Sequence, residues 1–346
     1  MSNATTSAGA DARLVLHIGT PKTGTTYLQG ILAQNRAELA KTGWSYPGRR
    51  VNQQHAVYGI CGSDIYYLSD TSQYQVVGER LLARLATPRI PRTLWSAEVL
   101  SQLDEGGVKR LLRQTGTPDK VVITVRGLHA LLPSMWQQLL KTGRTETLVE
   151  YVDRLDEHRG DRSTQPWIGY AFGDVVRRWS QHAPVHVVVF PSRVAGRNQL
   201  WHLFRGAVGL PEVNELTVET EEANVSLSAE AAEVLRRLNG TLSKGGKRRA
   251  EALRQHYLRQ AVFPLGDTDG GTRIVLPLET HDRVREWNEA ELDEVSRYAT
   301  AVHGNLSDAS FRTRPQVNTD PANMAEVTAR QLAELLAADV VDDTRE

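Results

Sequence analysis

The chain has 346 residues, of which 40% are hydrophobic, and its 41 Lys and Arg residues balance 41 Asp and Glu residues. This length suffices for one large α/β domain or two modest ones, and the zero net charge argues against a protein-wide basic field for nucleic acid. Cys61 is the only cysteine, which excludes an intrachain disulfide framework and a cysteine-rich zinc site and suits a reducing compartment.

The sequence shows no targeting or membrane signal. Residues 1–11 are small and polar and lack the apolar core of a signal peptide. No stretch approaches the roughly 18 apolar residues of a membrane span. We therefore expect a cytoplasmic protein with no membrane span and no nucleic-acid partner, although an enzyme acting at the inner membrane face would look the same.

A short apolar run, a glycine-bounded loop and a helix start follow one another near the N-terminus. Residues 14–18 predict a buried strand, and an amphipathic helix is predicted from Thr25 onward. The free N–H groups and the dipole of a helix start favour an anion, and Gly19 and Gly24 let the backbone come close to it. Lys22 adds a cation. Further hydroxyl donors are Thr23, Thr25 and Thr26. The stretch predicts a phosphate-binding loop.

This loop differs from an ordinary P-loop, whose pattern is G-x-x-x-x-G-K-[ST]. Gly19 and Gly24 have the required spacing and Thr26 fits the last position. However, Thr25 stands where the lysine belongs, and the lysine lies inside the loop at Lys22. This displacement argues against a standard ATP or GTP site.

Two candidate general bases follow the loop. Residues 44–62 are predicted to be mostly loop and contain Arg49, Arg50 and His55, and a histidine there suits proton transfer from an acceptor hydroxyl. After a helical pattern at 78–86, residues 93–98 predict a short strand that ends at Glu98. The alternatives are a hydrogen-bonded loop histidine and an acid that interacts with a helix dipole. The residues alone do not choose between His55 and Glu98.

A second phosphate-binding pair is predicted around residue 126. Residues 121–125 form the clearest buried strand, Arg126 ends it, and residues 128–141 are helical by pattern. Ser134 follows Arg126 by eight positions. An arginine fork at a strand end and a serine hydroxyl on the next helix can bind one phosphate together. The alternative for Arg126 is a structural ion pair.

The remaining elements continue the alternation of strands and helices. A helix is predicted at 145–158, a polar loop over the site at 159–167, a buried strand at 185–190 and helices at 198–208, 228–238, 289–302 and 325–338. Trp167, Tyr170 and Trp179 are either core residues or stacking surfaces for an acceptor. The repeated order predicts an α/β fold with a parallel sheet covered by helices on both faces, and ligands at the carboxyl ends of its strands.

The loop resembles the 5′-phosphosulfate loop of sulfotransferases that use 3′-phosphoadenosine 5′-phosphosulfate (PAPS). The resemblance rests on Thr20, Pro21, Lys22, Thr23, Gly24, Thr25 and Thr26. It implies that Lys22 contacts the 5′-phosphate and the bridging oxygen, that the threonines and the backbone hold the phosphate, and that the fold is the three-layer, P-loop-like sulfotransferase fold. Sugar-specific members use either a glutamate or a histidine as base, so the resemblance also leaves His55 and Glu98 open.

The pair at 126 and 134 is similar to the second sulfotransferase signature, the 3′-phosphate site. The resemblance implies that Arg126 and Ser134 bind the 3′-phosphate of the nucleotide. The chain departs from the signature in having Gly127-Leu128 for the usual Asn-Pro, and Trp136 where tyrosine is frequent. The basic segment at 243–249 resembles the loop over the adenosine 3′-phosphate, which implies binding roles for Lys247 and Arg248; the alternative is the start of a surface helix.

These inferences predict an enzyme that moves a sulfuryl group from PAPS to a hydroxyl of a small-molecule, glycan or glycolipid acceptor, with adenosine 3′,5′-bisphosphate (PAP) as product and no metal. The alternatives are an ATP-dependent kinase of the P-loop class and a non-catalytic nucleotide-binding protein. The expected organisation is a disordered tail at 1–12, a sulfotransferase domain at 13–315 with its sheet at 13–210 and a mostly helical part at 211–315, and a helical tail at 316–346.

Overall fold

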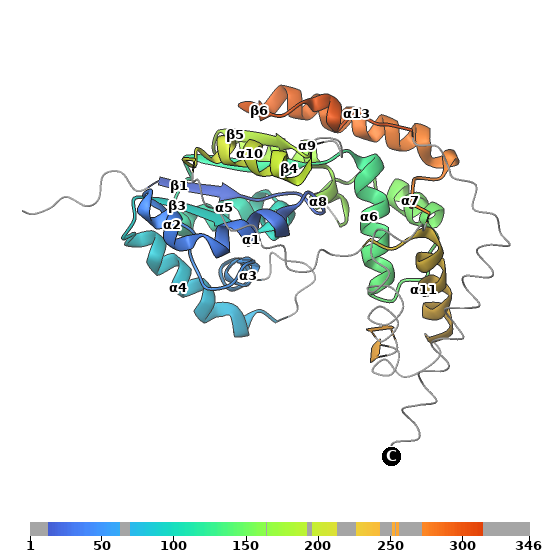
Figure 1. Cartoon of the computed structure of the whole chain (residues 1–346), viewed down its shortest axis with the longest axis horizontal. Helices are drawn as coiled ribbons and strands as arrows, with labels where there is room; N and C mark the ends of the chain where they lie inside the picture. Colours follow the sequence, from blue (N-terminus) through green and yellow to red (C-terminus); the bar gives the residue numbers. More distant parts are fainter. Residues whose placement is uncertain are drawn as a thin grey trace, which may run out of the picture. The chain divides into compact units, whose positions relative to one another are not determined.

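The computed structural model describes residues 13–62, 70–163, 165–191, 196–212, 226–242, 251–252, 254–255 and 272–313. Its main elements are β1 (Arg13–His17), α1 (Thr25–Gln34), α2 (Arg36–Lys41), β2 (Trp44–Ser45), α3 (Gln54–Cys61), α4 (Gln75–Ala86), β3 (Arg92–Ser96), the 3₁₀ helix η3 (Glu98–Gln102), α5 (Glu105–Thr115), β4 (Lys120–Val125), α6 (Leu128–Lys141), α7 (Leu148–Glu157), α8 (Trp167–Tyr170), α9 (Phe172–Ser180), β5 (Val185–Val189), α10 (Gly196–Val208), α11 (Ala229–Leu242), α13 (His281–Tyr298) and β6 (Ala301–His303) (Figure 1).

The chain divides into two compact units. The first consists of Met1–Leu128, His158–Thr220 and Trp287–Ser310, and the second of His129–Glu157, Glu221–Glu286 and Phe311–Glu346. The long helices α6 and α13 therefore each contribute residues to both units.

Within the described part of the first unit, six strands form one sheet in the order β2-β3-β1-β4-β5-β6. Every pairing is parallel; for example, Val15 lies opposite both Leu94 of β3 and Lys120 of β4. Parallel strands need helical crossovers, which place helices on both faces of the sheet. The α/β class with a parallel sheet is confirmed. The sheet also extends past residue 210, because β6 pairs with β5.

Successive residues of each strand point to opposite faces of the sheet, and helices cover the side chains on those faces. On one face, Val15, Leu94 and Val122 pack in a core cluster with Leu28 of α1 and Phe204 of α10. Helix α9 packs against β4 and β5. At the outer edge, His186 Nδ1 of β5 lies 3.1 Å from His303 Nε2 of β6.

The central strands determine where a ligand can bind. β1 lies between β3 and β4 and runs parallel to both. The loop after β1, the turn after β3 and the turn after β4 therefore emerge at the same carboxyl edge. Lys22, Glu98 and Arg126 belong to these three segments.

The prediction that 44–62 is mostly loop was wrong in its second half, where α3 forms. Ala56, Val57 and Cys61 are buried on this helix. Gly59, which resembles a helix breaker in the sequence, permits a close crossing with α4, since a Cβ on Gly59 would overlap the carbonyl oxygen of Tyr74.

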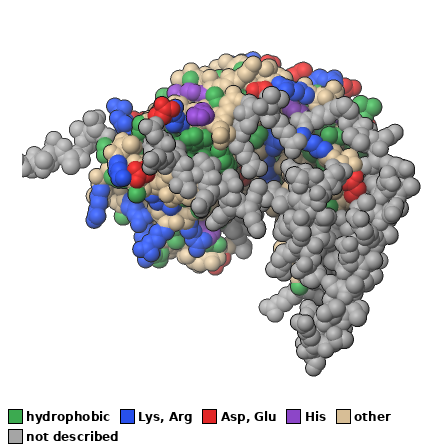
Figure 2. Space-filling view, in the orientation of Figure 1, with side chains coloured by type: hydrophobic (Ala, Val, Ile, Leu, Met, Phe, Trp, Pro, Cys, Tyr) green, Lys and Arg blue, Asp and Glu red, His purple; other side chains and the backbone are tan. Residues whose placement is uncertain are grey.

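The outer surface of α4 is basic. Arg80 and Arg84 are exposed one helical turn apart, and Lys and Arg side chains gather over this side of the first unit (Figure 2). Side chains of this kind keep a helix face solvated.

The second unit is helical in its described residues. Asn239 of α11 donates to the carbonyls of Leu140 and Arg144, both at 2.8 Å. Arg283 pairs with Asp153 of α7 at 2.7 Å. Among the described residues of both units, no helix has the length and apolar character needed to cross a membrane.

Candidate functional site

The loop between β1 and α1 is tied to the neighbouring strand β4. The amide of Thr20 donates to the carbonyl of Thr124 at 3.0 Å. The backbone then turns sharply, because Lys22 has φ 61° and Gly24 has φ 82°. A Cβ on Gly24 would lie 2.6 Å from Leu200 Cδ2. Both the left-handed conformation and the lack of space therefore require glycine at this position.

The loop ends at the N-terminus of α1. The first helical bond runs from the amide of Leu28 to the carbonyl of Gly24 at 3.1 Å. The N-cap residue is Gly24, which has no side chain to cap this end, and the first turn contains no acidic residue. The N–H groups before Leu28 have no carbonyl within the helix to bind, and the helix dipole is positive here. This end of α1 suits an anion.

The four loop threonines have different environments. The Thr20 hydroxyl donates to the Thr124 carbonyl at 3.0 Å and the Thr23 hydroxyl donates to the Thr20 carbonyl at 2.6 Å, and both side chains are buried. Thr25 donates from Oγ1 to Glu98 Oε2 at 2.5 Å, whereas Thr26 is exposed. The hydroxyls of Thr20 and Thr23 thus brace the loop, and Thr26 has the exposed hydroxyl.

Lys22 and Glu98 interact electrostatically in this site. Burial lowers the pKa of Lys22; the negative charge of Glu98 opposes this shift and the positive charge of Arg126 adds to it. Burial raises the pKa of Glu98, against the hydrogen bond from Thr25 and the charge of Lys22. A carboxyl with a raised pKa beside a partly desolvated ammonium is the kind of arrangement found in catalytic sites.

Arg126 lies against the same loop. Its Nη1 donates to the carbonyl of Lys22 at 3.3 Å, and its guanidinium carbon lies 5.0 Å from the centre of the Phe190 ring. The side chain is half-buried. The charge of Arg126 is therefore positioned within the site, beside the backbone that carries Lys22.

His55 has a different environment. It lies on α3, and its ring centroid is 4.7 Å from that of Tyr74 and 5.9 Å from that of Tyr58. Burial and the positive charge of Arg50 lower its pKa. Of the two candidate bases, Glu98 accepts a hydrogen bond from Thr25, a residue of the predicted phosphate-binding loop.

The structure does not test three other predicted phosphate ligands. Ser134 is on α6, within the second unit. Lys247 and Arg248 lie outside the described residues. The phosphate-binding roles of all three stay predictions.

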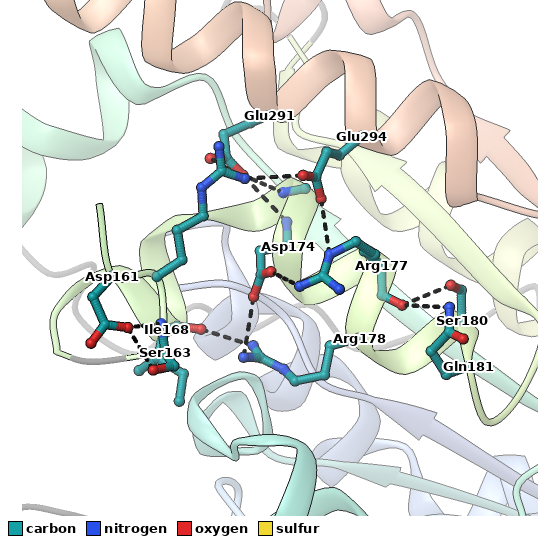
Figure 3. A network of polar contacts seen from close by, with 12 residues as sticks. Asp161, Ser163, Ile168, Asp174, Arg177, Arg178, Ser180, Gln181, Glu291 and Glu294 are labelled. Carbon is teal, nitrogen blue, oxygen red and sulfur yellow. Dashed lines mark hydrogen bonds and ion pairs between the residues drawn. The ribbon is translucent and has the colours of Figure 1, made fainter. Parts of the chain in front are cut away.

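A polar network joins α9 and α13 through Asp174, Arg177, Arg178, Glu291 and Glu294 (Figure 3). Arg159 pairs at 2.7 Å with Glu291, whose side chain is fully buried on α13, and the amide of Gly173 donates to the same carboxylate at 2.8 Å. Burial raises the pKa of Glu291, against the charge of Arg159. Trp167 and Trp179 are fully buried. They are core residues, which confirms the first of the two alternatives for these tryptophans.

This network reaches the segment that carries Glu98. Arg178 is buried and donates from Nη2 to the carbonyl of Ser101 at 3.1 Å and to that of Ile168 at 2.9 Å. The Ser101 hydroxyl donates to the carbonyl of Glu98 at 2.8 Å. Asp174 balances the charge of Arg178. The Arg178 guanidinium thus joins α8 to η3, the 3₁₀ helix that contains Glu98.

Sequence reasoning missed His17, the last residue of β1. The side chain is buried and its Nδ1 lies 2.8 Å from Ser96 Oγ. Burial lowers its pKa to about 3. A signal was present: His17, Ser96 and Thr124 are polar residues that follow the apolar centres of their strands, near the carboxyl ends where those strands meet the site.

The described residues contain no group of three or more His, Cys, Asp or Glu side chains arranged to hold a metal ion. No protein-family model and no curated protein matches the chain. Among solved structures, the crystal structure of a sulfotransferase from Alicyclobacillus acidocaldarius matches with a TM-score of 0.42 and 14% sequence identity, over 71% of this chain and 97% of that chain. A likeness this distant does not by itself assign a family or an activity.

Proposed function

We propose that the chain transfers a sulfuryl group from PAPS to a hydroxyl of a small-molecule or glycan acceptor. The observation that carries the proposal is the position of Glu98 at the loop that contains Lys22: Glu98 accepts a hydrogen bond from Thr25 at 2.5 Å, and the charges of Glu98 and Lys22 act on each other. In-line transfer needs a cation for the leaving group and a base for the acceptor. The two residues supply both.

On the donor side, the N–H groups at the start of α1 bind the 5′-phosphate and the Lys22 ammonium lies against the bridging oxygen. The S–O bond to the phosphate breaks, and its electron pair stays on that oxygen. Lys22 neutralises the charge that develops there, as cations do for a leaving phosphate. Arg126 supplies the charge for the 3′-phosphate, and Ser134 is proposed as its second ligand from the sequence.

On the acceptor side, Glu98 is the general base. Its Oε2 accepts from the Thr25 hydroxyl, which holds the carboxylate in one orientation. The acceptor oxygen forms the new bond to sulfur while its proton passes to the carboxylate. A pKa raised toward the working pH makes Glu98 a stronger base than an exposed glutamate. The products are the sulfated acceptor and PAP.

The first experiment measures nucleotide binding by calorimetry. PAP, with a phosphate at both ends, should bind in the absence of magnesium, and Arg126→Ala should weaken that binding. Arg80→Ala is the control, because Arg80 is an exposed arginine on α4. Binding of ATP that requires magnesium, with no binding of PAP, would contradict the proposal in favour of a P-loop kinase.

The second experiment tests catalysis. The protein is incubated with PAPS and fractionated extract, and mass spectrometry searches for an acceptor that gains one sulfate. The Lys22→Ala protein is the negative control. Tight PAP binding with no sulfated product across a broad acceptor panel would instead indicate a non-catalytic nucleotide-binding protein.

A further inference from the structure

A chain of buried polar side chains runs beneath the phosphate-binding loop and crosses three strands. Its members are Gln29 of α1, Ser96 of β3, His17 of β1, Thr124 of β4, and Thr23 and Thr20 of the loop. All six side chains are buried. Buried polar groups need hydrogen-bond partners, and here each finds its partner in the next member of the chain.

The direction of the hydrogen bonds follows from counting protons, starting in the loop. Thr23 Oγ1 lies 2.6 Å from the carbonyl of Thr20, which can only accept. The single Thr23 proton is therefore used in that bond. Thr23 Oγ1 also lies 2.6 Å from Thr124 Oγ1, so in this second bond Thr124 is the donor.

The same count determines the tautomer of His17. Thr124 has used its only proton, so its contact with His17 Nε2 at 3.5 Å must be donated by the ring. Burial keeps the ring neutral, with a pKa of about 3, and a neutral imidazole has one N–H. This count assigns the proton to Nε2, with Nδ1 accepting from the Ser96 hydroxyl at 2.8 Å. The assignment requires the Ser96 proton to point toward His17 and not toward Tyr46, which also interacts with Ser96 and donates its own proton to the carbonyl of Val51. Ser96 Oγ in turn accepts from Gln29 Nε2 at 3.0 Å.

We propose that His17, as the neutral Nε2–H tautomer, is a positioning residue that fixes the conformation of the phosphate-binding loop through Thr124 and Thr23. Its effect on sulfuryl transfer rests on the proposed function; its effect on the loop does not.

The loop needs such support because its conformation is costly. Lys22 has φ 61°, a left-handed conformation that costs a non-glycine residue roughly 1–2 kcal/mol. Thr23 follows it directly and is held from two sides, by the Thr20 carbonyl and by Thr124. With Thr23 fixed, the Lys22 backbone cannot relax without breaking a buried hydrogen bond. The hydrogen bonds of Thr23 thereby fix the backbone position from which the Lys22 side chain extends.

Nitrogen NMR on the full chain tests the tautomer directly. The His17 signals are assigned by their loss in His17→Gln. Between pH 5 and pH 8 we expect one neutral form with the proton on Nε2 and no titration. A proton on Nδ1, or a charge change within this range, would overturn the assignment.

Hydrogen exchange tests the positioning without reference to any activity. His17→Met keeps the approximate size but removes the donor, whereas His17→Gln can still present an N–H toward Thr124. We expect amides in a peptide covering 18–26 to exchange about tenfold or more faster in His17→Met, and less so in His17→Gln. His186→Met is the control, since it alters a strand histidine at the edge of the sheet. Unchanged exchange in a folded His17→Met protein would refute the positioning role.

Binding connects the loop to the proposed function. His17→Met and Thr124→Val should each weaken PAP binding about tenfold or more, and the double variant should lose little more, because both break the same chain. Additive losses would show that His17 and Thr124 do not act through one series of hydrogen bonds. If the wild-type protein fails to bind PAP, the proposed function is contradicted. The NMR measurement of the tautomer and the hydrogen-exchange measurement still test the role of His17 in that case. If His17→Met does not fold, Thr124→Val replaces it in the exchange experiment.

Discussion

Lys22 combines a left-handed backbone with a partly buried charge, and both properties make its role testable. Lys22→Ala should lower the rate of transfer by about 10²–10³-fold, the usual loss when one stabilising group at a developing charge is removed. The fold should persist, because the side chain is half-buried and the backbone gains no new constraint. Steady-state kinetics and circular dichroism measure the two effects.

The matched control is Lys41→Ala, whose ammonium lies on the surface and pairs with Glu38 at 2.8 Å. It should leave the rate unchanged. A Lys22→Ala enzyme with full activity would remove Lys22 from the mechanism.

Glu98 gives a prediction in which activity and stability change in opposite directions. Glu98→Gln should reduce kcat by about 10²–10⁴-fold, the contribution of a general base, with PAP binding largely kept. Because the folded pKa of Glu98 is raised, ionisation at neutral pH opposes folding. The variant should therefore have a higher Tm than wild type above that pKa, and the difference should shrink as pH falls through it. Calorimetry across pH measures this; a lower Tm for Glu98→Gln at neutral pH would contradict it.

The pH profile of the wild-type enzyme follows from the same shift. A base works only when ionised, so the rate should fall as pH drops through the raised pKa of Glu98, at a pH above the value near 4.3 of an ordinary glutamate. This acid limb should disappear in Glu98→Gln. If the acid limb of the pH profile persists in Glu98→Gln, it reports the titration of a group other than Glu98.

Single residues also show where sequence reasoning reaches its limit. The spacing of Gly19, Lys22 and Gly24 predicts a phosphate-binding loop without any coordinates. It does not reveal that Thr23 points into the protein and Thr26 outward, because side-chain direction in an irregular loop depends on hydrogen bonds from a distant strand. The selection of Glu98 over His55 depends likewise on a contact across 73 residues of sequence.

Among the elements, α9 and α13 are joined by the buried Glu291. Its carboxylate accepts from the Arg159 guanidinium and from the Gly173 amide. Glu291→Ala should lower the free energy of unfolding by about 3–5 kcal/mol, because removing one partner leaves a buried charge uncompensated. Denaturant titration measures it. Glu38→Ala, which breaks an exposed pair, should cost less than about 1 kcal/mol. Equal losses of unfolding free energy in the two variants would show that the burial of Glu291 does not strengthen its contribution to stability.

The crossing of α3 and α4 depends on two glycines. A Cβ on Gly78 would lie 2.8 Å from the carbonyl carbon of Gly59, so Gly78→Ala should force the helices apart and cost about 1–3 kcal/mol. Gly206→Ala is the control, since nothing lies within 4 Å of its Cβ on α10; it should be neutral or slightly stabilising. A neutral Gly78→Ala in thermal unfolding would contradict the close crossing.

Elements were predictable in proportion to their burial and length. The apolar runs of β1, β3, β4 and β5 identify the central strands. The edge strands β2 and β6 were missed, since two or three residues give no detectable period. The helix predicted at 289–302 instead ends at Tyr298, because residues 301–303 pair with β5 as an edge strand, a contact between segments distant in sequence.

For the whole molecule, ligand binding should appear as added stability. Nucleotide that binds only the folded chain stabilises it by about 2.7 kcal/mol at a concentration of 100 Kd. PAP should therefore raise Tm in buffer containing a metal chelator, and Lys22→Ala should diminish the rise. Differential scanning fluorimetry measures it. A rise of equal size with adenosine alone would show that the phosphates do not contribute.

The alternation of elements predicted the parallel sheet, which the structure confirms. The division into two units was not predictable in the same way. Helices α6 and α13 each pass from one unit to the other, and a continuous helical period gives no sign of the boundary. Domain boundaries read from composition depend on linkers, and here the boundaries at 128/129 and 286/287 fall inside helices.

The Arg159–Glu291 pair has a consequence for synthesis of the chain. Its partners are 132 residues apart, an interval that a ribosome translates in roughly 7–26 s at about 5–20 residues per second. During that time Arg159 and Arg162 have been made but their shared carboxylate has not. The nascent chain must keep both arginines hydrated, so the packing of α9 against α13 is completed only after Glu291 has been translated.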